Sequence, residues 1–421
     1  MTYEMEYLMH LFSCGATGRQ AQPPTQPLDW EKVVKLAVEQ SVTYTVALPI
    51  KKYDLGCPPH IVERLTSSLR GAAVKNALKT DAVLDILQKM EHAGIPTLLF
   101  KGIDVARYYK NPECRVSADT DIYVRPEDEE RAARFLEGEG FEMKKRPSDS
   151  NHAVGSHPTI GRVELHIKFI SDEFSGILLK DWSVDENAFT NCVKQQLSGR
   201  EYYALEPCDN LIYLTFHMLK HFLYGGISLR MMMDNALYSK NNLGAIDCKR
   251  YEDMLTSAGF LYLMQVIFGA MVKYCGFDET DFPITPVLND EDITALLNDL
   301  EAGGWQGQKA GVDGVFAWYC YRYQEADKSG DKRELGNIRQ GHLNEYKDIV
   351  FPPMETMSKL YPKLSEKRYL YPYYLSRRLF EKSGKLLSGK ASVPKLMIKD
   401  ESELSDTAKE RLELFKNLKI M

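Results

Sequence analysis

The sequence lacks the cysteine pattern of a disulfide-rich or zinc-ribbon protein. A disulfide framework needs many cysteines in a short chain, and a zinc ribbon needs two closely spaced Cys-x-x-Cys pairs. The chain has 421 residues, no such pair, and eight scattered cysteines: Cys14, Cys57, Cys114, Cys192, Cys208, Cys248, Cys275 and Cys320. We therefore expect reduced thiols that mostly lie in the core.

A hydrophobic run long enough to cross a membrane is also missing. The nearest candidate, residues 261–272 (LYLMQVIFGAMV), is shorter than the roughly 18 to 20 residues that a spanning helix needs, and it contains Gln265. The start of the chain, MTYEMEYLMHLFSC, carries acids where a signal peptide needs positive charge. The sequence predicts a buried helix at 261–272 and a cytoplasmic protein without a membrane partner.

Positive charge is not in excess either. The chain has 53 Lys and Arg against 59 Asp and Glu, a formal net charge of −6. Because nucleic-acid binders usually present a strongly basic surface, we do not expect a nucleic-acid partner. Residues 355–400 depart from this balance, with eleven Lys and Arg against four Asp and Glu. An amphipathic helix with long basic side chains explains them more simply than an acidic partner does.

The length and the 44% hydrophobic content suit two or three globular domains. The patterns divide the chain into a helical region at 1–75, an α/β core at 76–170, a helical domain at 171–330 and a basic, aromatic-rich helical region at 331–421. We therefore predict an α+β fold, in which a small mixed sheet is embedded in a largely helical chain.

The α/β core alternates strand-like and helix-like segments. Short apolar runs at 95–102 (IPTLLFKG) and 119–124 (DTDIYV) are typical of buried strands. Residues 162–169 (RVELHIKF) alternate apolar and polar side chains, which predicts a strand with Glu164 on its polar face. Residues 141–145 are predicted to add a further strand.

Two acids, Asp119 and Asp121, open the second of these strands. Because residues i and i+2 of a strand share a face, the two carboxylates would point the same way, about 7 Å apart, and repel each other. A positive group is therefore expected between them. The spacing alone is a weak signal, since Asp290 and Asp292 repeat it at a predicted helix start, where acids favour the helix dipole.

The acids of neighbouring strands predict a metal site if they face one way. Asp119, Asp121 and Glu164 would offer hard oxygen ligands with one side open, and Mg²⁺ takes substrate phosphates at such a side. Two Mg²⁺ ions held there would polarise a transferring phosphoryl group.

Several short motifs follow one another in order: LLFKG, Arg115, ADTDIYV, a helix ending in EGEGF, VELHIKF, and later HMLKHF and SLRMMMD. Together they closely resemble the uncharacterised nucleotidyltransferase family of the DNA polymerase beta-like superfamily, over about residues 76–240. The resemblance implies a nucleotidyltransferase core at 76–170 that moves a nucleoside monophosphate from an NTP, most simply AMP from ATP, to a hydroxyl group. The acceptor would be a small molecule or a protein.

The resemblance also implies the roles of the three acids. Asp119 and Asp121 match the metal-binding pair of the superfamily. Glu164 matches its third acid, which binds the second metal and helps to deprotonate the acceptor hydroxyl.

The triphosphate contacts follow from the same resemblance. Lys101 and Gly102 occupy the Leu-Lys-Gly position of the family, where glycine lets the backbone approach the triphosphate and lysine adds charge. Arg115 fits a fork for phosphate oxygens. The chain departs from the usual pattern here, because its Lys-Gly pair lies farther upstream of Asp119 than the usual Gly-Ser pair and no serine follows it. Further departures are Phe100, Thr120 and Ile167, none of which removes a charged ligand.

Four further residues are candidates for substrate contacts. His166 shares the polar strand face of Glu164, and His152 lies in a segment predicted to be a loop near the site. Arg230 and Asp234, spaced i and i+4 on a predicted helix, either pair with each other or face the acceptor.

His217 and His221 have the i, i+4 spacing that zinc-binding helices use. The sequence shows no third ligand and no intervening glutamate of a metalloprotease. We therefore expect these histidines to pack on the core.

Two other functions stay open at this point. The chain is either an enzyme or a non-catalytic, regulatory module that holds nucleotide in the same fold. A phosphotransferase is a weaker alternative, because the sequence lacks the expected HxD-type catalytic loop. The acceptor, the preferred base of the NTP and the oligomeric state are not predicted.

Overall fold

The computed structural model describes residues 1–146, 150–170, 184–303, 311–330, 354, 357–358, 361, 363–377 and 405–420. The chain forms two compact units, Met1–Gly311 with Lys416–Met421, and Val312–Phe415. Every candidate site residue lies in the first unit. Most of the basic segment 355–400 lies outside the described residues. The four regions predicted from the sequence stay a prediction.

The first part of the chain is helical. Five helices precede the sheet: α1 (Tyr3–Thr17), α2 (Trp30–Glu39), α3 (Thr43–Lys52), α4 (Pro59–Ser67) and α5 (Leu69–His92). The Asp29 side chain accepts hydrogen bonds from the backbone N–H groups of Glu31 and Lys32, and so caps α2. α5 ends just before Gly94, whose φ of 71° glycine adopts without strain.

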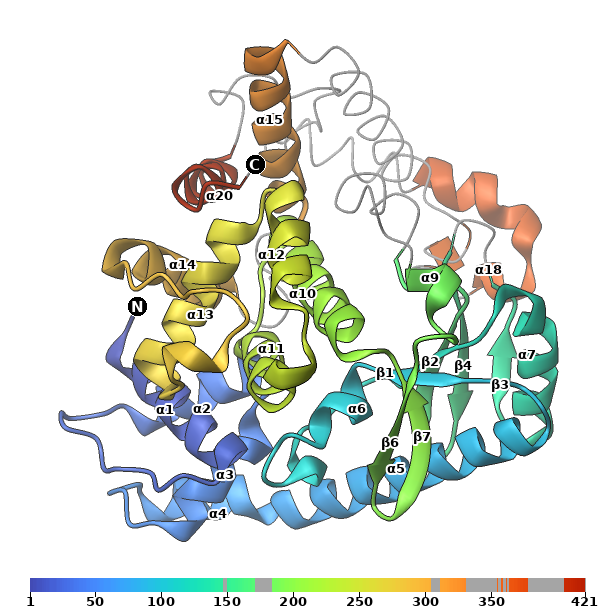
Figure 1. Ribbon diagram of the computed structural model, residues 1–421, viewed down its shortest axis with the longest axis horizontal. Coiled ribbons are helices and arrows are strands. Elements are labelled where there is room, and N and C mark those ends of the chain that lie inside the picture. Colours follow the sequence, from blue (N-terminus) through green and yellow to red (C-terminus); the bar gives the residue numbers. More distant parts are fainter. Residues whose placement is uncertain are drawn as a thin grey trace. The chain divides into compact units, whose positions relative to one another are not determined.

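A five-stranded mixed sheet forms the centre of the candidate core (Figure 1). Its strand order is β1 (Leu98–Phe100), β2 (Asp121–Tyr123), β5 (Gly161–His166), β4 (His152–His157) and β3 (Glu142–Lys144). β2 and β5 are parallel, and the other three pairs are antiparallel. The small mixed sheet in a largely helical chain confirms the predicted α+β fold.

One face of the sheet is apolar and is covered by α5 and α7 (Glu129–Gly138). Leu99, Ile122 and Leu165 lie on this face and pack with buried residues of both helices. Because side chains alternate along a strand, the residues between them point to the opposite face. That opposite face carries the candidate site.

The structure corrects the prediction for His152 and His157. We predicted a loop there, but the two residues begin and end β4, which pairs with β5 along its length. Gly155 and Ser156 make the segment look irregular in the sequence. β4 forms nevertheless because its backbone hydrogen-bonds to β3 on one side and β5 on the other, and this pairing outweighs a weak local preference.

The remaining elements of the first unit are mostly helices. They are α6 (Gly102–Ala106), the 3₁₀ turns η1 (Pro112–Cys114), η2 (Pro126–Asp128), η3 (Leu243–Ala245) and η4 (Glu279–Asp281), the hairpin β6 (Val193–Leu197) and β7 (Arg200–Ala204), and helices α9 (Val184–Asn187), α10 (Pro207–Tyr224), α11 (Leu229–Asn242), α12 (Cys248–Ser257), α13 (Leu261–Cys275) and α14 (Asp290–Gly303). α13 is the predicted buried helix, and α14 begins at the second Asp-x-Asp pair, as predicted. In the described part of the chain, no helix is long and apolar enough to span a membrane.

The second unit is described only in part. It contains most of α15 (Gly311–Ser329) and of α20 (Asp406–Asn417), with α18 (Lys363–Glu366) and the 3₁₀ turn η6 (Arg368–Leu370) between them in the sequence. Trp318 packs edge-on against Phe415, with ring centroids 6.0 Å apart. This aromatic contact joins the two longer helices of the unit.

Gly15 lets α1 approach α3 closely. A Cβ at this position would lie 2.0 Å from the carbonyl oxygen of Thr45. The Thr45 hydroxyl donates to the carbonyl oxygen of Cys114, 3.2 Å away, next to Arg115 of the candidate site. The contact between α1 and α3 therefore supports the turn that positions Arg115.

We expect Gly15→Ala to destabilise the protein by about 1–3 kcal/mol, because the added methyl group must push the Thr45 backbone away. Gly71→Ala is the matched control, since nothing lies within 4 Å of a Cβ added to this position in α5. It should be neutral or stabilising by up to about 1 kcal/mol. Urea unfolding of both variants measures the difference, and equal stabilities would contradict the close approach.

Candidate active site

Two predicted acids lie side by side on the parallel strands. Asp121 of β2 is the register partner of Glu164 of β5. Side chains at paired positions of parallel strands share a face, so both carboxylates point away from α5 and α7. The register of two strands far apart in the sequence therefore brings together the second and third predicted acids.

Lys101 supplies the positive charge that the acids require. Its Nζ donates to Asp121 Oδ1 at 2.9 Å, and the two side chains are only 14% and 1% exposed. Burial opposes both charges, but the Asp121 carboxylate raises the pKa of Lys101. The Lys101 ammonium, together with His166, holds the pKa of Asp121 well below its usual range despite burial. Both groups are therefore charged at neutral pH.

Asp119 stands just before β2, in the turn that leads into the strand. The Ser117 hydroxyl donates to Asp119 Oδ1 at 3.2 Å and to its carbonyl oxygen at 3.1 Å. Lys79 of α5 donates to the carbonyl oxygens of Ser117 and Asp119, each at 3.0 Å. Asp119 is half-buried and lines the same cavity as Asp121. The turn is thus held in place by α5, and the first two acids line one small cavity.

Two histidines surround Glu164. His166 Nε2 lies 3.0 Å from Asp121 Oδ1 and 3.5 Å from Glu164 Oε2. His152 is the register partner of His166, and its Nε2 lies 3.7 Å from Glu164 Oε2. Burial raises the pKa of Glu164, but hydrogen bonds from His166 and Arg162 outweigh it and bring the pKa to about 2. The structure therefore brings His152 and His166 close to the acids, and their contact with a substrate stays a prediction.

Arg115 forms a bidentate ion pair with another residue of the protein. Its Nε and Nη2 donate to the two carboxylate oxygens of Asp234, at 3.0 and 2.6 Å. Tyr109 also donates to Asp234, at 2.7 Å. The third guanidinium nitrogen, Nη1, is buried and has no hydrogen-bond partner among the described residues. Only this nitrogen is left to contact a ligand.

Arg230 does not form the pair with Asp234 that helical spacing offers as one alternative. Its Nη1 donates instead to the carbonyl oxygen of Val116 at 2.7 Å. Its Nε is buried and has no acceptor within the part of the chain that the structure describes. Burial, and then the neighbouring charge of Arg115, lower the pKa of Arg230. Arg115 and Arg230 thus lie near each other, and only Arg115 pairs with Asp234.

Two small cavities meet at Lys101 and His217, which line both. The arginine hollow, of about 70 Å³, is lined by Lys101, Gly102, Arg115, Ser117, Asp119, Asp121, Leu214, His217, Arg230, Met231, Asp234 and Asn235. The histidine hollow, of about 130 Å³, is lined by Lys101, Asn151, His152, Glu164, His166, Phe169, Ile170, Tyr213, Phe216, His217 and Lys220. All ten predicted site residues line one hollow or the other.

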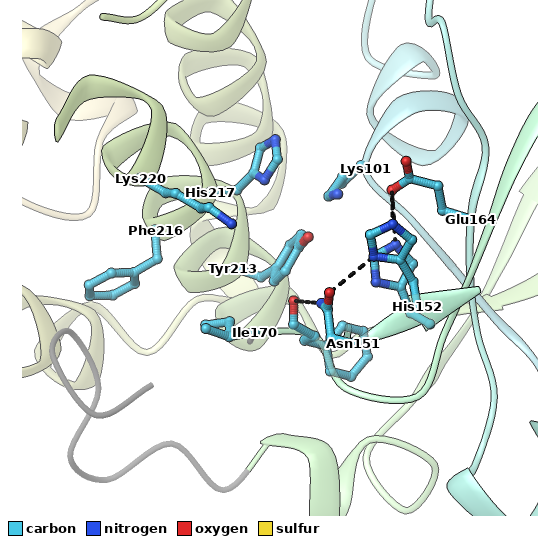
Figure 2. Close-up of a pocket in the computed structure, with 11 residues that line it drawn as sticks. Lys101, Asn151, His152, Glu164, Ile170, Tyr213, Phe216, His217 and Lys220 are labelled. Carbon is cyan, nitrogen blue, oxygen red and sulfur yellow. Dashed lines mark hydrogen bonds and ion pairs between the residues drawn. The ribbon is translucent and has the colours of Figure 1, made fainter. Parts of the chain in front are cut away.

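One wall of the site is formed by residues of α10 that were not predicted as site residues. Tyr213, His217 and Lys220 project from α10 toward Lys101 and Glu164, across the histidine hollow (Figure 2). Their spacing of i, i+4 and i+7 places them on one helix face, a signal that the sequence contained. His217 is half-buried at this cavity rather than fully packed in the core. Burial and the charge of Lys101 hold its pKa well below the usual range, so the imidazole is neutral.

The two hollows differ in the chemistry that they offer. The arginine hollow presents two buried guanidinium groups, and a Cβ at Gly102 would lie 2.9 Å from the Ser117 hydroxyl, so glycine keeps this wall open. This hollow suits an anion. The histidine hollow presents a carboxylate and several imidazoles, which suit a cation or a proton transfer. Asp121 lies between them, on the sheet.

We expect Lys101→Met to destabilise the protein by about 2–4 kcal/mol, because it leaves the buried Asp121 carboxylate without its ammonium partner. Lys144→Met is the control, since Lys144 is exposed on β3. Its effect should stay within about 0.5 kcal/mol. Denaturant unfolding in EDTA compares the two variants. Similar losses for both would show that the Lys101 ion pair carries little stability.

Comparisons with known proteins identify the family of the chain. The family model described as "uncharacterised nucleotidyltransferase" matches residues 26–271, more than half of the chain. No curated protein matches. Among solved structures, an antigenic nucleotidyltransferase-like protein from Paracoccidioides brasiliensis is similar at 15% identity and a TM-score of 0.28, over 39% of this chain and 76% of that one. That likeness is too weak to support an argument about the site, whereas the family match is extensive. The chain belongs to the uncharacterised nucleotidyltransferase family.

Proposed function

We propose that the protein is a Mg²⁺-dependent nucleotidyltransferase. It would move a nucleoside monophosphate, most simply AMP from ATP, to a hydroxyl of a small-molecule or protein acceptor. One observation carries the proposal: the register of β2 and β5 sets Asp121 beside Glu164, and Asp119 lines the same cavity as Asp121. Charged acids thus adjoin a cavity that contains two buried arginines.

The donor set fits Mg²⁺. Asp119, Asp121 and Glu164 are the residues that would hold it, and all three offer hard oxygen ligands. When bound, the ions would neutralise the acids and polarise the phosphoryl group under attack. Asp121 and Glu164 are ready for such a role, because the pKa of each lies well below neutral.

The arginine hollow fits the triphosphate. Arg115 Nη1 and Arg230 Nε are buried donors without partners among the described residues. A buried donor without an acceptor costs roughly 1–3 kcal/mol, which an anion in this hollow would recover. Gly102, which lines the same hollow, leaves room for the phosphate groups. The predicted contacts of Lys101, Gly102 and Arg115 with the triphosphate are thus supported, although Arg115 would use one nitrogen instead of a fork.

The histidine hollow is the proposed entry for the acceptor. Glu164 and His217 both line it, and each is in a basic form at neutral pH, since the carboxylate is ionised and the imidazole neutral. Either group can accept a proton from a hydroxyl that approaches the α-phosphate. The nucleotide would then enter from the arginine hollow and the acceptor hydroxyl from the histidine hollow, so that the two meet at Asp121. Binding from both sides would hold the reacting atoms in place.

A second candidate function is a nucleotide-binding module without turnover. It is favoured by the charge balance of Asp121, whose carboxylate is contacted by both Lys101 and His166. Melting temperatures with each of the four NTPs, with Mg²⁺ and with EDTA, would identify a bound nucleotide, since ligand at 100 times its dissociation constant adds about 2.7 kcal/mol. Binding without pyrophosphate release over long incubation would favour the module.

Single alanine substitutions of the acids test the enzyme. We expect Asp119→Ala, Asp121→Ala and Glu164→Ala each to lower pyrophosphate release from the bound NTP by at least about 1,000-fold, because each removes a carboxylate from the reacting centre. Asp290→Ala, in the other Asp-x-Asp pair at the start of α14, is the control and should keep the wild-type rate. Unchanged turnover in the three site variants would refute the mechanism.

Arg230→Met tests the triphosphate site. We expect NTP binding to weaken by roughly 10- to 100-fold, because a charge-assisted hydrogen bond to phosphate is lost. Stability should fall by about 1–3 kcal/mol, because the Val116 carbonyl oxygen loses the hydrogen bond from Arg230 Nη1. Arg134→Met is the control, on the exposed face of α7 with a side chain 71% exposed. Calorimetric titration measures both, and equal affinities for the two variants would place the triphosphate elsewhere.

A further inference from the structure

Three metal-ligating side chains converge on the histidine hollow. His152 comes from β4, and Glu164 and His166 come from β5. One ligand atom from each lies within 4.8 Å of the other two. His152 and His166 are register partners, so paired strands rather than a loop hold both imidazoles. In the described residues, this is the one group of three or more such side chains that gathers so closely.

The spacing of the ligand atoms suits a tetrahedral cation. Ligand bonds of about 2.0–2.1 Å in a tetrahedral site separate neighbouring ligand atoms by about 3.4 Å. Glu164 Oε2 lies 3.5 Å from His166 Nε2 and 3.7 Å from His152 Nε2. All three ligand atoms lie within 4.8 Å of one another. An inward movement of the side chains, in which His166 Nε2 releases its proton and exchanges its hydrogen bond to Asp121 Oδ1 for the cation, would complete three ligand bonds.

A hydrogen bond to Asn151 prepares His152 as a ligand. The Asn151 carbonyl oxygen Oδ1 lies 3.0 Å from His152 Nδ1, so this ring nitrogen donates and carries the proton (Figure 2). Nε2 then has a free lone pair, which faces the Glu164 carboxylate. Two electron-rich atoms that face each other repel unless a cation lies between them. An outer hydrogen bond that fixes the histidine tautomer is also the usual support of a metal ligand.

The ligand types select against Mg²⁺. Two imidazoles and one carboxylate are typical ligands of Zn²⁺ and related transition metals, whereas Mg²⁺ prefers oxygen ligands. The cluster lines a cavity of about 130 Å³, which leaves space for a water molecule or a substrate oxygen as the fourth ligand.

We propose that His152, Glu164 and His166 form a transition-metal site of the Zn²⁺ class, with its open position toward the histidine hollow. The site is separate in chemistry from the Mg²⁺ ions of the proposed function and does not rest on nucleotidyl transfer. Both the transition-metal site and the Mg²⁺ ions would use Glu164. The metal bound to Glu164 therefore also affects the part of the reaction centre that the acceptor hydroxyl approaches.

Metal titration of the full chain tests the proposal. The protein is stripped with EDTA, exchanged into chelator-free buffer, and titrated with Co²⁺, whose visible absorption reports a tetrahedral site, and then with Zn²⁺ in competition. We expect one equivalent to bind and millimolar Mg²⁺ not to displace it. His152→Gln should weaken Zn²⁺ binding by well over 10-fold, and Asn151→Ala by about 10-fold, because it frees the ring of His152.

The matched control is His157→Gln, at the other end of β4 and outside the cluster. It should bind Zn²⁺ like the wild type. Equal weakening in His152→Gln and His157→Gln, or wild-type affinity in both His152→Gln and Asn151→Ala, would overturn the proposal. Asn151→Ala keeps the test valid if His152→Gln does not fold.

The same preparations separate this proposal from the proposed function. Mg²⁺-dependent stabilisation by an NTP that persists without any Zn²⁺ binding would refute the transition-metal site alone. Zn²⁺ binding without any response to nucleotide would refute the nucleotidyltransferase alone.

Discussion

The buried ion pair of Lys101 and Asp121 is the interaction on which the rest of the site depends. A carboxylate with a 1% exposed side chain pays a large desolvation penalty, and it stays ionised only with a close positive partner. The partner is close because Phe100 and Asp121 pair in the ladder of β1 and β2, and Lys101 directly follows Phe100. Lys101 also has a φ of 55°, uncommon for a residue with a side chain, where the backbone turns from β1 into α6.

This ion pair separates two regions of opposite chemistry. On one side, Arg115 pairs with Asp234 and Arg230 donates to the carbonyl oxygen of Val116, and each arginine keeps a buried donor without a described partner. On the other side, Glu164 lies among imidazoles. A phosphate group requires positively charged donors, whereas a metal ion requires carboxylates or imidazoles. The site offers both, because neighbouring strands contribute different side chains to one face of the sheet. The same face would therefore hold a nucleotide and its cations.

Helices α10 and α11 supply the side chains that complete the site on this face of the sheet. α11 supplies Asp234, which fixes the Arg115 side chain, and α10 supplies His217, which lines both hollows. Without these helices the sheet face would be open to water, and the charges would be screened. The site is thus a joint product of the α/β core and the helices that follow it, which is consistent with a family match that runs through both.

The sequence by itself determined the local features. Alternation along β5 puts Glu164 and Leu165 on opposite faces of the sheet, and the strand expected at 119–124 forms over Asp121–Tyr123 and carries Asp121. α2 begins at the residue that caps it, and α14 begins at its Asp-x-Asp pair. Such features depend on neighbours within a few residues, so a reading of the chain can find them. The ordered motifs also led to the family.

Only the tertiary structure decided which distant groups meet. Arg115 and Asp234 are 119 residues apart in the sequence. The i, i+4 spacing of Arg230 and Asp234 does not indicate that Asp234 forms its ion pair with Arg115 instead of Arg230. β4 forms because two neighbouring strands pair with it, against the local preference of its glycine and serine, and this pairing is what brings His152 to Glu164. Register, burial and partner choice are set by the free energy of the whole packed unit, and no short stretch of sequence contains that information.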